Sequence, residues 1–366
     1  MSDHAIQNEA FLRNIYARGP FSGHGFCVHA TGVPLHEWEG YDYTLSDAPV
    51  SEWVPWVVEN YERQVRMLEA VGDDSVPVAK LGTGTQIYAA AFGCRVHRYD
   101  DTNPAALPLV RTAEEADEIE APDIWRSREL SRVFELGSLV RDELGEDAYL
   151  GPCDVQSGFD TASLIWNKEH FLMAMMEPDD SAAAKRLVDK CASLLKTFLA
   201  ELRREFPRLS PCHCPAAWAP PEMGPWLSND ECGIMGTAMF EEHALPELID
   251  LSEHFGGLGM HCCADAEHQF ASFNAIPNFY AFNRVLARSG WDPILDHFSG
   301  PEAPAHVLSW ITDEAALKLM DDAAEGTRFI FVLDTADPEQ GKAWYEKMRA
   351  LSPRTDLIPY TEPVDE

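Results

Sequence analysis

The feature of this sequence that most limits its fold is a repeated alternation of short β-rich runs with longer amphipathic segments. We predict eight strands, at residues 25–30, 75–81, 148–153, 210–214, 258–263, 277–282, 306–310 and 328–333. The clearest helix is predicted over 181–206, where apolar side chains recur every three or four positions from Leu187 to Leu202. Strands that alternate with helices form parallel βαβ units, and about eight units favour an α/β fold of the (β/α)8 TIM barrel type over an open sheet.

The length of the chain agrees with one large barrel. Its 366 residues, of which 46% are hydrophobic, are enough for a single sizeable core. No internal repeat or low-complexity linker divides the sequence. We therefore predict one domain over residues 1–366, with an N-terminal extension at about residues 1–70.

The charge and the apolar runs limit the classes of partner. Acidic residues number 61 against 28 basic ones, which gives a net charge of -33. Such a surface repels phosphate backbones and anionic lipids, so we expect a small-molecule substrate and neither nucleic acid nor a membrane as partner. The N-terminus lacks the apolar core of a signal peptide, and no run of 18 apolar residues is present. These features predict a cytoplasmic protein.

Thiols and an imidazole cluster at the end of one predicted strand. The stretch "MHCCADA" ends the strand at 258–263. Because side chains alternate along a strand, His261 and Cys263 point to one face, whereas Cys262 packs on the other. An imidazole nitrogen and a thiolate suit Zn²⁺, and a catalytic zinc takes a third protein ligand from elsewhere.

The preceding predicted strand offers one candidate for that third ligand. It ends in "SPCHC", and alternation places Cys212 and Cys214 on one face. Consecutive barrel strands are neighbours, so Cys214 could lie close to His261. The other interpretation of both motifs is simple packing, because free cysteine is among the most frequently buried residue types. The spacing alone leaves the two interpretations open.

Several further segments occur in a distinctive order. They are "AAAFGCRV" (89–96), "GPCDVQSGFDTASLIWNKEHFLMAMMEPDD" (151–180), "WLSNDECGIMGTAMFEEHALPEL" (226–248), "MHCCADA" (260–266) and "DPEQGKAWYEKM" (337–348). Together they resemble the uroporphyrinogen decarboxylase-like (URO-D) superfamily, which includes zinc-dependent methyltransferases that act with corrinoid proteins. The resemblance extends over roughly residues 75–340. It implies a (β/α)8 barrel and a methyl group moved between a small methylated compound or thiol and a corrinoid on a partner protein.

The same resemblance implies roles for individual residues. In the methyltransferase branch a His-x-Cys pair and a later cysteine at the last strand hold zinc, and His261 and Cys263 match the pair. No cysteine follows Cys263, so Asp334, which ends "RFIFVLD", is the nearest candidate for the third ligand. An acidic residue in the loop "WLSNDECG" faces the barrel mouth in the superfamily, which makes Asp230 the candidate catalytic residue.

Three residues are candidates for contact with the substrate. The segment that carries Gln156 and Asp160 lines the cavity in the superfamily, so the resemblance implies that these two side chains contact a ligand. Trp218 lies in a proline-rich loop, where its ring could wall an apolar pocket or could simply pack.

Two other functions stay open beside methyl transfer. One is a carboxy-lyase of the uroporphyrinogen decarboxylase kind, and the other is a non-catalytic barrel that binds a small molecule or a tetrapyrrole. The carboxy-lyase fits the sequence less well, because residues 76–93 contain no acidic side chain where that branch carries its catalytic aspartate. Arg18 also stands alone where those enzymes have an arginine-rich segment.

Overall fold

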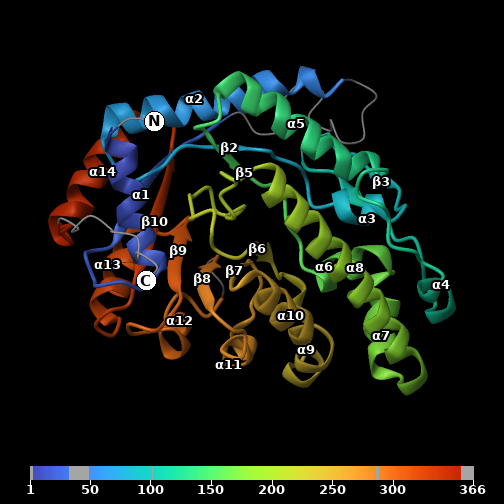
Figure 1. The fold of residues 1–366 in the computed structure, drawn as a ribbon. Helices are drawn as coiled ribbons and strands as arrows, with labels where there is room; N and C mark the ends of the chain where they lie inside the picture. Colours follow the sequence, from blue (N-terminus) through green and yellow to red (C-terminus); the bar gives the residue numbers. More distant parts are fainter. Residues whose placement is uncertain (1–2, 33–48, 101, 286–287, 356–366) are drawn as a thin grey trace, which may run out of the picture.

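The computed structural model describes residues 3–32, 49–100, 102–285 and 288–355 (Figure 1). Eight parallel strands of these residues form the barrel: β1 (Gly25–Ala30), β2 (Val78–Lys80), β5 (Tyr149–Gly151), β6 (Trp226–Ser228), β7 (Leu258–Cys262), β8 (Phe279–Arg284), β9 (Ala305–Ser309) and β10 (Phe329–Thr335). Six of them form one sheet in the order β1-β10-β9-β8-β7-β6, and β2 pairs with β5. The prediction of a (β/α)8 barrel is confirmed.

Short contacts join the two sheets into a ring. A parallel bridge between Gln156, which follows β5, and Ser228 of β6 connects them on one side. On the other side, the backbone N–H of Asp74 donates to the carbonyl of Phe26 in β1, and the Asp74 carboxylate accepts from the N–H of Phe26 at 2.8 Å. A buried carboxylate thus replaces part of the ladder between β1 and the start of β2, because every buried backbone donor needs an acceptor.

Helices surround the strands. The longer ones are α2 (Val54–Val71), α5 (Arg128–Leu144), α8 (Pro178–Glu205), α10 (Leu245–Phe255), α13 (Asp313–Asp322) and α14 (Pro338–Leu351). The helix predicted at 181–206 is α8, which begins with Pro178 at a position where a missing N–H costs nothing and carries acidic residues in its first turn. Its apolar stripe from Leu187 to Leu202 is buried, as the periodicity predicts.

One end of the barrel is closed by the first helix, α1 (Asp3–Tyr16, dark blue in Figure 1). Phe11 and Tyr16 of α1 pack against inward-facing side chains of the strands, among them Tyr280 and Ile330. Among the described residues of the range predicted as an N-terminal extension, 1–70, α1 precedes β1, and β1 and most of α2 also lie within this range. The opposite end, where the strands finish, is left for a site, as in barrel enzymes generally.

The strand predicted at 210–214 is wrong. Leu209 makes a bridge to Leu150 of β5, but the chain then leaves the sheet and re-enters it only at β6. Prolines at 211 and 215 remove backbone donors, which disfavours a central strand there. We call residues 209–225 the inner segment, because Cys212 and Trp218 pack among the inward-facing side chains of the barrel.

No helix in the described part of the chain is both long enough and apolar enough to cross a membrane. This finding agrees with the hydropathy of the sequence.

Candidate metal centre and the adjoining cavity

Three possible metal ligands lie together at the C-terminal ends of β6 and β7. They are Asp230, His261 and Cys263, whose ligand atoms all lie within 4.8 Å of one another. His261 is in β7, Cys263 directly follows that strand, and Asp230 follows β6 by two residues. Since β6 and β7 are parallel neighbours, their ends meet at the same rim of the barrel.

The alternation predicted for the "HCC" stretch is confirmed. Cys262 lies in the hydrophobic core with its sulfur 3.7 Å from the sulfur of Cys232. His261 and Cys263, in contrast, both contribute to the group of possible ligands. Strand geometry, and not residue type, therefore decides which thiol packs in the core and which joins the possible ligands, because Cys262 and Cys263 have the same side chain.

The imidazole of His261 is held in one orientation. Its Nδ1 contacts the side-chain oxygen of Asn283 on β8, and the amide of Asn283 in turn donates to the carbonyl of Val307 on β9. The amide oxygen can only accept, so Nδ1 carries a proton, and Nε2, which lies 3.8 Å from a carboxylate oxygen of Asp230, is the nitrogen placed to bind a metal. A hydrogen bond on the far nitrogen of a ligating histidine is the usual way in which proteins orient such a ligand.

Asp230 is also held in place, by Asp160. The buried carboxylate of Asp160 accepts from the backbone N–H of Asp230 at 2.7 Å and of Glu231 at 3.1 Å. Burial and the neighbouring charge of Asp230 raise the pKa of Asp160 well above its usual range. The Asp230 carboxylate accepts from the N–H of Cys263 at 2.7 Å, which ties the two loops together. These bonds hold the loop that carries Asp230, and the predicted contact of Asp160 with a ligand stays a prediction.

Cys214 of the inner segment also reaches the imidazole. Burial lowers the pKa of His261, but hydrogen bonds to Cys214 and Cys263, together with the charge of Asp230, raise it well above its ordinary value. Three electron-rich side chains thus surround one imidazole, an arrangement that a cation would stabilise. The donors are one nitrogen, one or two sulfurs and one carboxylate oxygen, so this site fits Zn²⁺ by chemistry and number.

Asp334, the sequence-based candidate for the third ligand, lies elsewhere on the rim. It is in β10, next to β1, and its carboxylate accepts from Nδ1 of His29 at 2.8 Å. Two strands, β9 and β8, separate β10 from β7. In the group of possible ligands the third place belongs to Asp230, which sequence reasoning had expected to be a catalytic residue.

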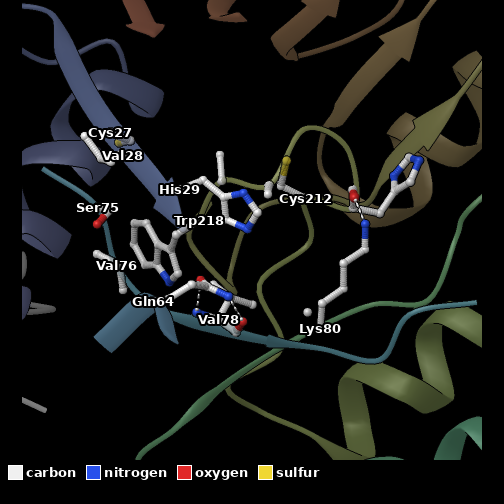
Figure 2. Close-up of a pocket in the computed structure, with 14 residues that line it drawn as sticks. Cys27, Val28, His29, Gln64, Ser75, Val76, Val78, Lys80, Cys212 and Trp218 are labelled. Carbon is white, nitrogen blue, oxygen red and sulfur yellow. Dashed lines mark hydrogen bonds between the residues drawn. The ribbon is translucent and has the colours of Figure 1, made fainter. Parts of the chain in front are cut away.

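A cavity adjoins this group on the other side of the inner segment (Figure 2). It is lined by β1, by residues 75–80 and by the inner segment, and Trp218 forms part of its wall, as one of the two interpretations expected. His213 connects the cavity with the metal group: its ring lies 6.3 Å from that of His261, and its carbonyl accepts from Nζ of Lys80 at 2.5 Å. Gln156 is buried and donates to the carboxylate of Asp154.

Asp154 and Asn283 are the residues that sequence reasoning missed. Burial raises the pKa of Asp154, whereas Gln156, Lys80 and His261 lower it, so this carboxylate lies within electrostatic reach of both the cavity and the metal group. The signal that could have found Asn283 is its place on the strand after "MHCC", where an inward-facing amide is expensive to bury without a partner.

Comparisons with known proteins agree with this fold. Residues 62–205 match the family model of uroporphyrinogen decarboxylase (URO-D). A solved structure of a methyltransferase from Methanosarcina mazei is similar over 94% of this chain and 98% of that chain, with a TM-score of 0.64 and 14% sequence identity. No curated protein matches the sequence. The resemblance to the URO-D-like superfamily is thus confirmed, although the stretch matched by the family model ends before β6 and β7.

Proposed function

From its URO-D-like barrel and its group of possible ligands, we propose that this chain is a zinc-dependent methyltransferase. It would move a methyl group between a small methylated compound or thiol and a corrinoid carried by a partner protein. The observation that supports the proposal most is the convergence of Asp230, His261 and Cys263, with the imidazole already oriented by Asn283. Ligands that are held before the metal arrives lose little entropy on binding it.

The residues around the site have separable tasks in this proposal. Asp230, His261 and Cys263 would hold Zn²⁺, and Asp160 fixes the loop that carries Asp230. Bound zinc would polarise the oxygen or sulfur of a methyl donor, or lower the pKa of a bound thiol so that it reacts as a thiolate. Asn283 keeps the proton of His261 on Nδ1, away from the metal. The likeness to the methyltransferase from Methanosarcina mazei, at 14% identity, supports the fold, and the choice of reaction depends on the group of possible ligands.

Metal analysis of purified variants tests the ligand set. We expect about one zinc per chain in the wild type and in Cys262→Ala, since Cys262 packs against Cys232. We expect His261→Ala and Cys263→Ala to lose the metal. Cys262→Ala and Cys263→Ala form a matched pair, because the same atom is removed one residue apart. Full zinc retention in a His261→Ala, Cys263→Ala double variant would refute the proposal.

A second comparison decides the third ligand. Asp230→Ala should lose zinc, whereas Asp334→Ala should retain it, because Asp334 contacts His29 and is outside the group. Methyl transfer to and from free corrinoid, measured with and without a chelator, then tests the reaction. Carboxy-lyase activity that survives complete removal of the metal would favour the decarboxylase alternative. The match to the family model of uroporphyrinogen decarboxylase is the reason to test this alternative.

A further inference from the structure

The cavity beside the inner segment presents polar groups that the metal group does not use. His29 at the end of β1 and Lys80 at the end of β2 line it, together with Trp218 (Figure 2). Two other polar side chains of its wall are satisfied within the protein: Gln64 exchanges two hydrogen bonds with the backbone of Val78, and Ser75 donates to Asp73. His213 also lines the cavity; its Nε2 contacts Ser228, and among the described residues its buried Nδ1 has no partner. A ligand in this cavity would therefore meet few free polar groups, and these groups differ in whether they donate or accept hydrogen bonds.

His29 is oriented by Asp334. The two residues are register partners on β1 and β10, and Nδ1 of His29 lies 2.8 Å from a carboxylate oxygen of Asp334. An ionised carboxylate only accepts hydrogen bonds, so the shared proton is on Nδ1. In the neutral imidazole this leaves Nε2 as an acceptor, and within the part of the chain that the structure describes Nε2 has no hydrogen-bond partner. His29 thus offers the cavity an oriented acceptor.

Lys80 and Trp218 offer the opposite kind of group. The Lys80 ammonium has three donors, of which one goes to the carbonyl of His213. Trp218 is buried, and among the described residues its indole Nε1 has no partner, although a buried donor normally has one. The indole ring also supplies part of the apolar wall of the cavity, which suits an apolar body. The cavity therefore combines a cation, a spare donor and an apolar wall with the acceptor on His29.

We propose that this cavity binds a small hydroxycarboxylic acid. Its hydroxyl donates to Nε2 of His29, its carboxylate accepts from Lys80, and its carbon skeleton packs against Trp218. A single carboxylate is compatible with a chain of net charge -33, because a nearby ammonium outweighs distant charges that salt screens. The proposal rests on the cavity alone and holds whether or not zinc binds to the neighbouring group.

Binding of matched probes to the full chain tests this site. The probes are 3-hydroxybenzoate and 4-hydroxybenzoate, which hold the two groups at two spacings, with benzoate and phenol as partners that each lack one group. Calorimetric titration should show the better hydroxybenzoate binding about fivefold more tightly than benzoate and about ten- to hundredfold more tightly than phenol. Loss of the carboxylate should cost more affinity than loss of the hydroxyl, because hydrogen bonds to a charged group are stronger.

Variants assign each contact to its residue. His29→Phe keeps a ring of similar size and should lower hydroxybenzoate affinity to that of benzoate, without changing benzoate itself. Asp334→Ala should have the same effect, since it removes the acceptor that fixes the proton on Nδ1. Lys80→Met should reduce affinity for the two acids and leave phenol unchanged, and Lys80→Arg should restore it in part. Thermal unfolding identifies variants that have lost the fold.

Three outcomes would overturn the proposal. The first is that no probe binds at concentrations up to about 10 mM, which corresponds to negligible recognition. The second is that benzoate, phenol and the hydroxybenzoates bind equally. The third is that folded His29→Phe and Lys80→Met variants bind every probe as the wild type does. Zinc loss in the ligand variants with unchanged probe binding would leave this site intact, so the two proposals fail separately.

Discussion

Replacing Asn283 by alanine should weaken metal binding without touching a ligand. Asn283 is fully buried, and its amide oxygen is the acceptor for Nδ1 of His261. The side chain of His261 is 9% exposed, so water cannot easily take the place of the lost oxygen. An N–H left without an acceptor in such a position costs about 1–3 kcal/mol.

Part of that cost is expected to appear in zinc affinity. The freed ring can rotate or exchange its tautomer, and Nε2 then no longer faces Asp230 reliably. Loss of such an outer partner typically weakens metal binding by about 10- to 100-fold, which is about 1.4–2.7 kcal/mol. Competition with a chromophoric chelator measures this affinity directly. Asn283→Asp is the matched control, because it keeps an acceptor oxygen at the same place and should bind zinc at least as tightly as the wild type.

The outcome that would refute this reasoning is specific. If folded Asn283→Ala binds zinc within twofold of the wild type, the orientation of His261 does not depend on the contact with Asn283. If Asn283→Asp loses as much zinc affinity as Asn283→Ala, the important contact of Asn283 is the hydrogen bond that its NH2 group donates to Val307, and not the one that its oxygen accepts. Urea unfolding of both variants separates these effects from a general loss of stability.

Three further predictions concern the supports of the site. Asp160→Ala removes the acceptor of two backbone N–H groups and should weaken zinc binding about tenfold. The control Asp117→Ala, at the surface, should leave zinc affinity unchanged. Equal zinc affinities of the two variants would exclude a positioning role for Asp160. Burial raises the pKa of Glu247 from 4.5 to about 8, so the folded chain holds this proton more tightly. The stabilisation that this proton gives is lost as the pH rises from about 5 to about 8, so the unfolding free energy of the wild type should fall over that range. In Glu247→Gln this pH-dependent fall should be smaller. In Gly224→Ala the new Cβ would lie 1.7 Å from the carbonyl oxygen of Gly257. This clash should lower the unfolding free energy, measured in urea, by at least about 2 kcal/mol. The control Gly236→Ala has open space around the new Cβ and should cost far less.

Periodicity predicted the barrel because most of its strands are short, buried and continuous in sequence. The strands at 258–263, 277–282, 306–310 and 328–333 were all found within one or two residues of the expected bounds. The strand between β5 and β7 was misplaced because the chain approaches the sheet at Leu209, leaves it, and returns at Trp226. An apolar run with cysteines has the same pattern in a strand as in a segment packed inside the barrel.

The site shows a similar limit. Alternation along β7 predicted which side chains of "HCC" face the rim, since that follows from strand geometry alone. The third possible ligand could not be derived in that way, because Asp230 is in a loop whose position depends on two hydrogen bonds to Asp160. Asp334 is at the end of a correctly predicted strand, but only the order of strands around the ring shows that its neighbour is His29.

The contact between Lys80 and the carbonyl of His213 joins the cavity to the segment that lies against the possible metal ligands. One ammonium binds the inner segment from the cavity side, and the same segment brings His213 and Cys214 against His261 on the other. A cavity ligand that drew Lys80 away from His213 would alter the free energy of that segment, and with it the affinity of His261 for a metal. Thermodynamic linkage then requires the converse, so that occupancy of the metal group changes cavity affinity by the same factor.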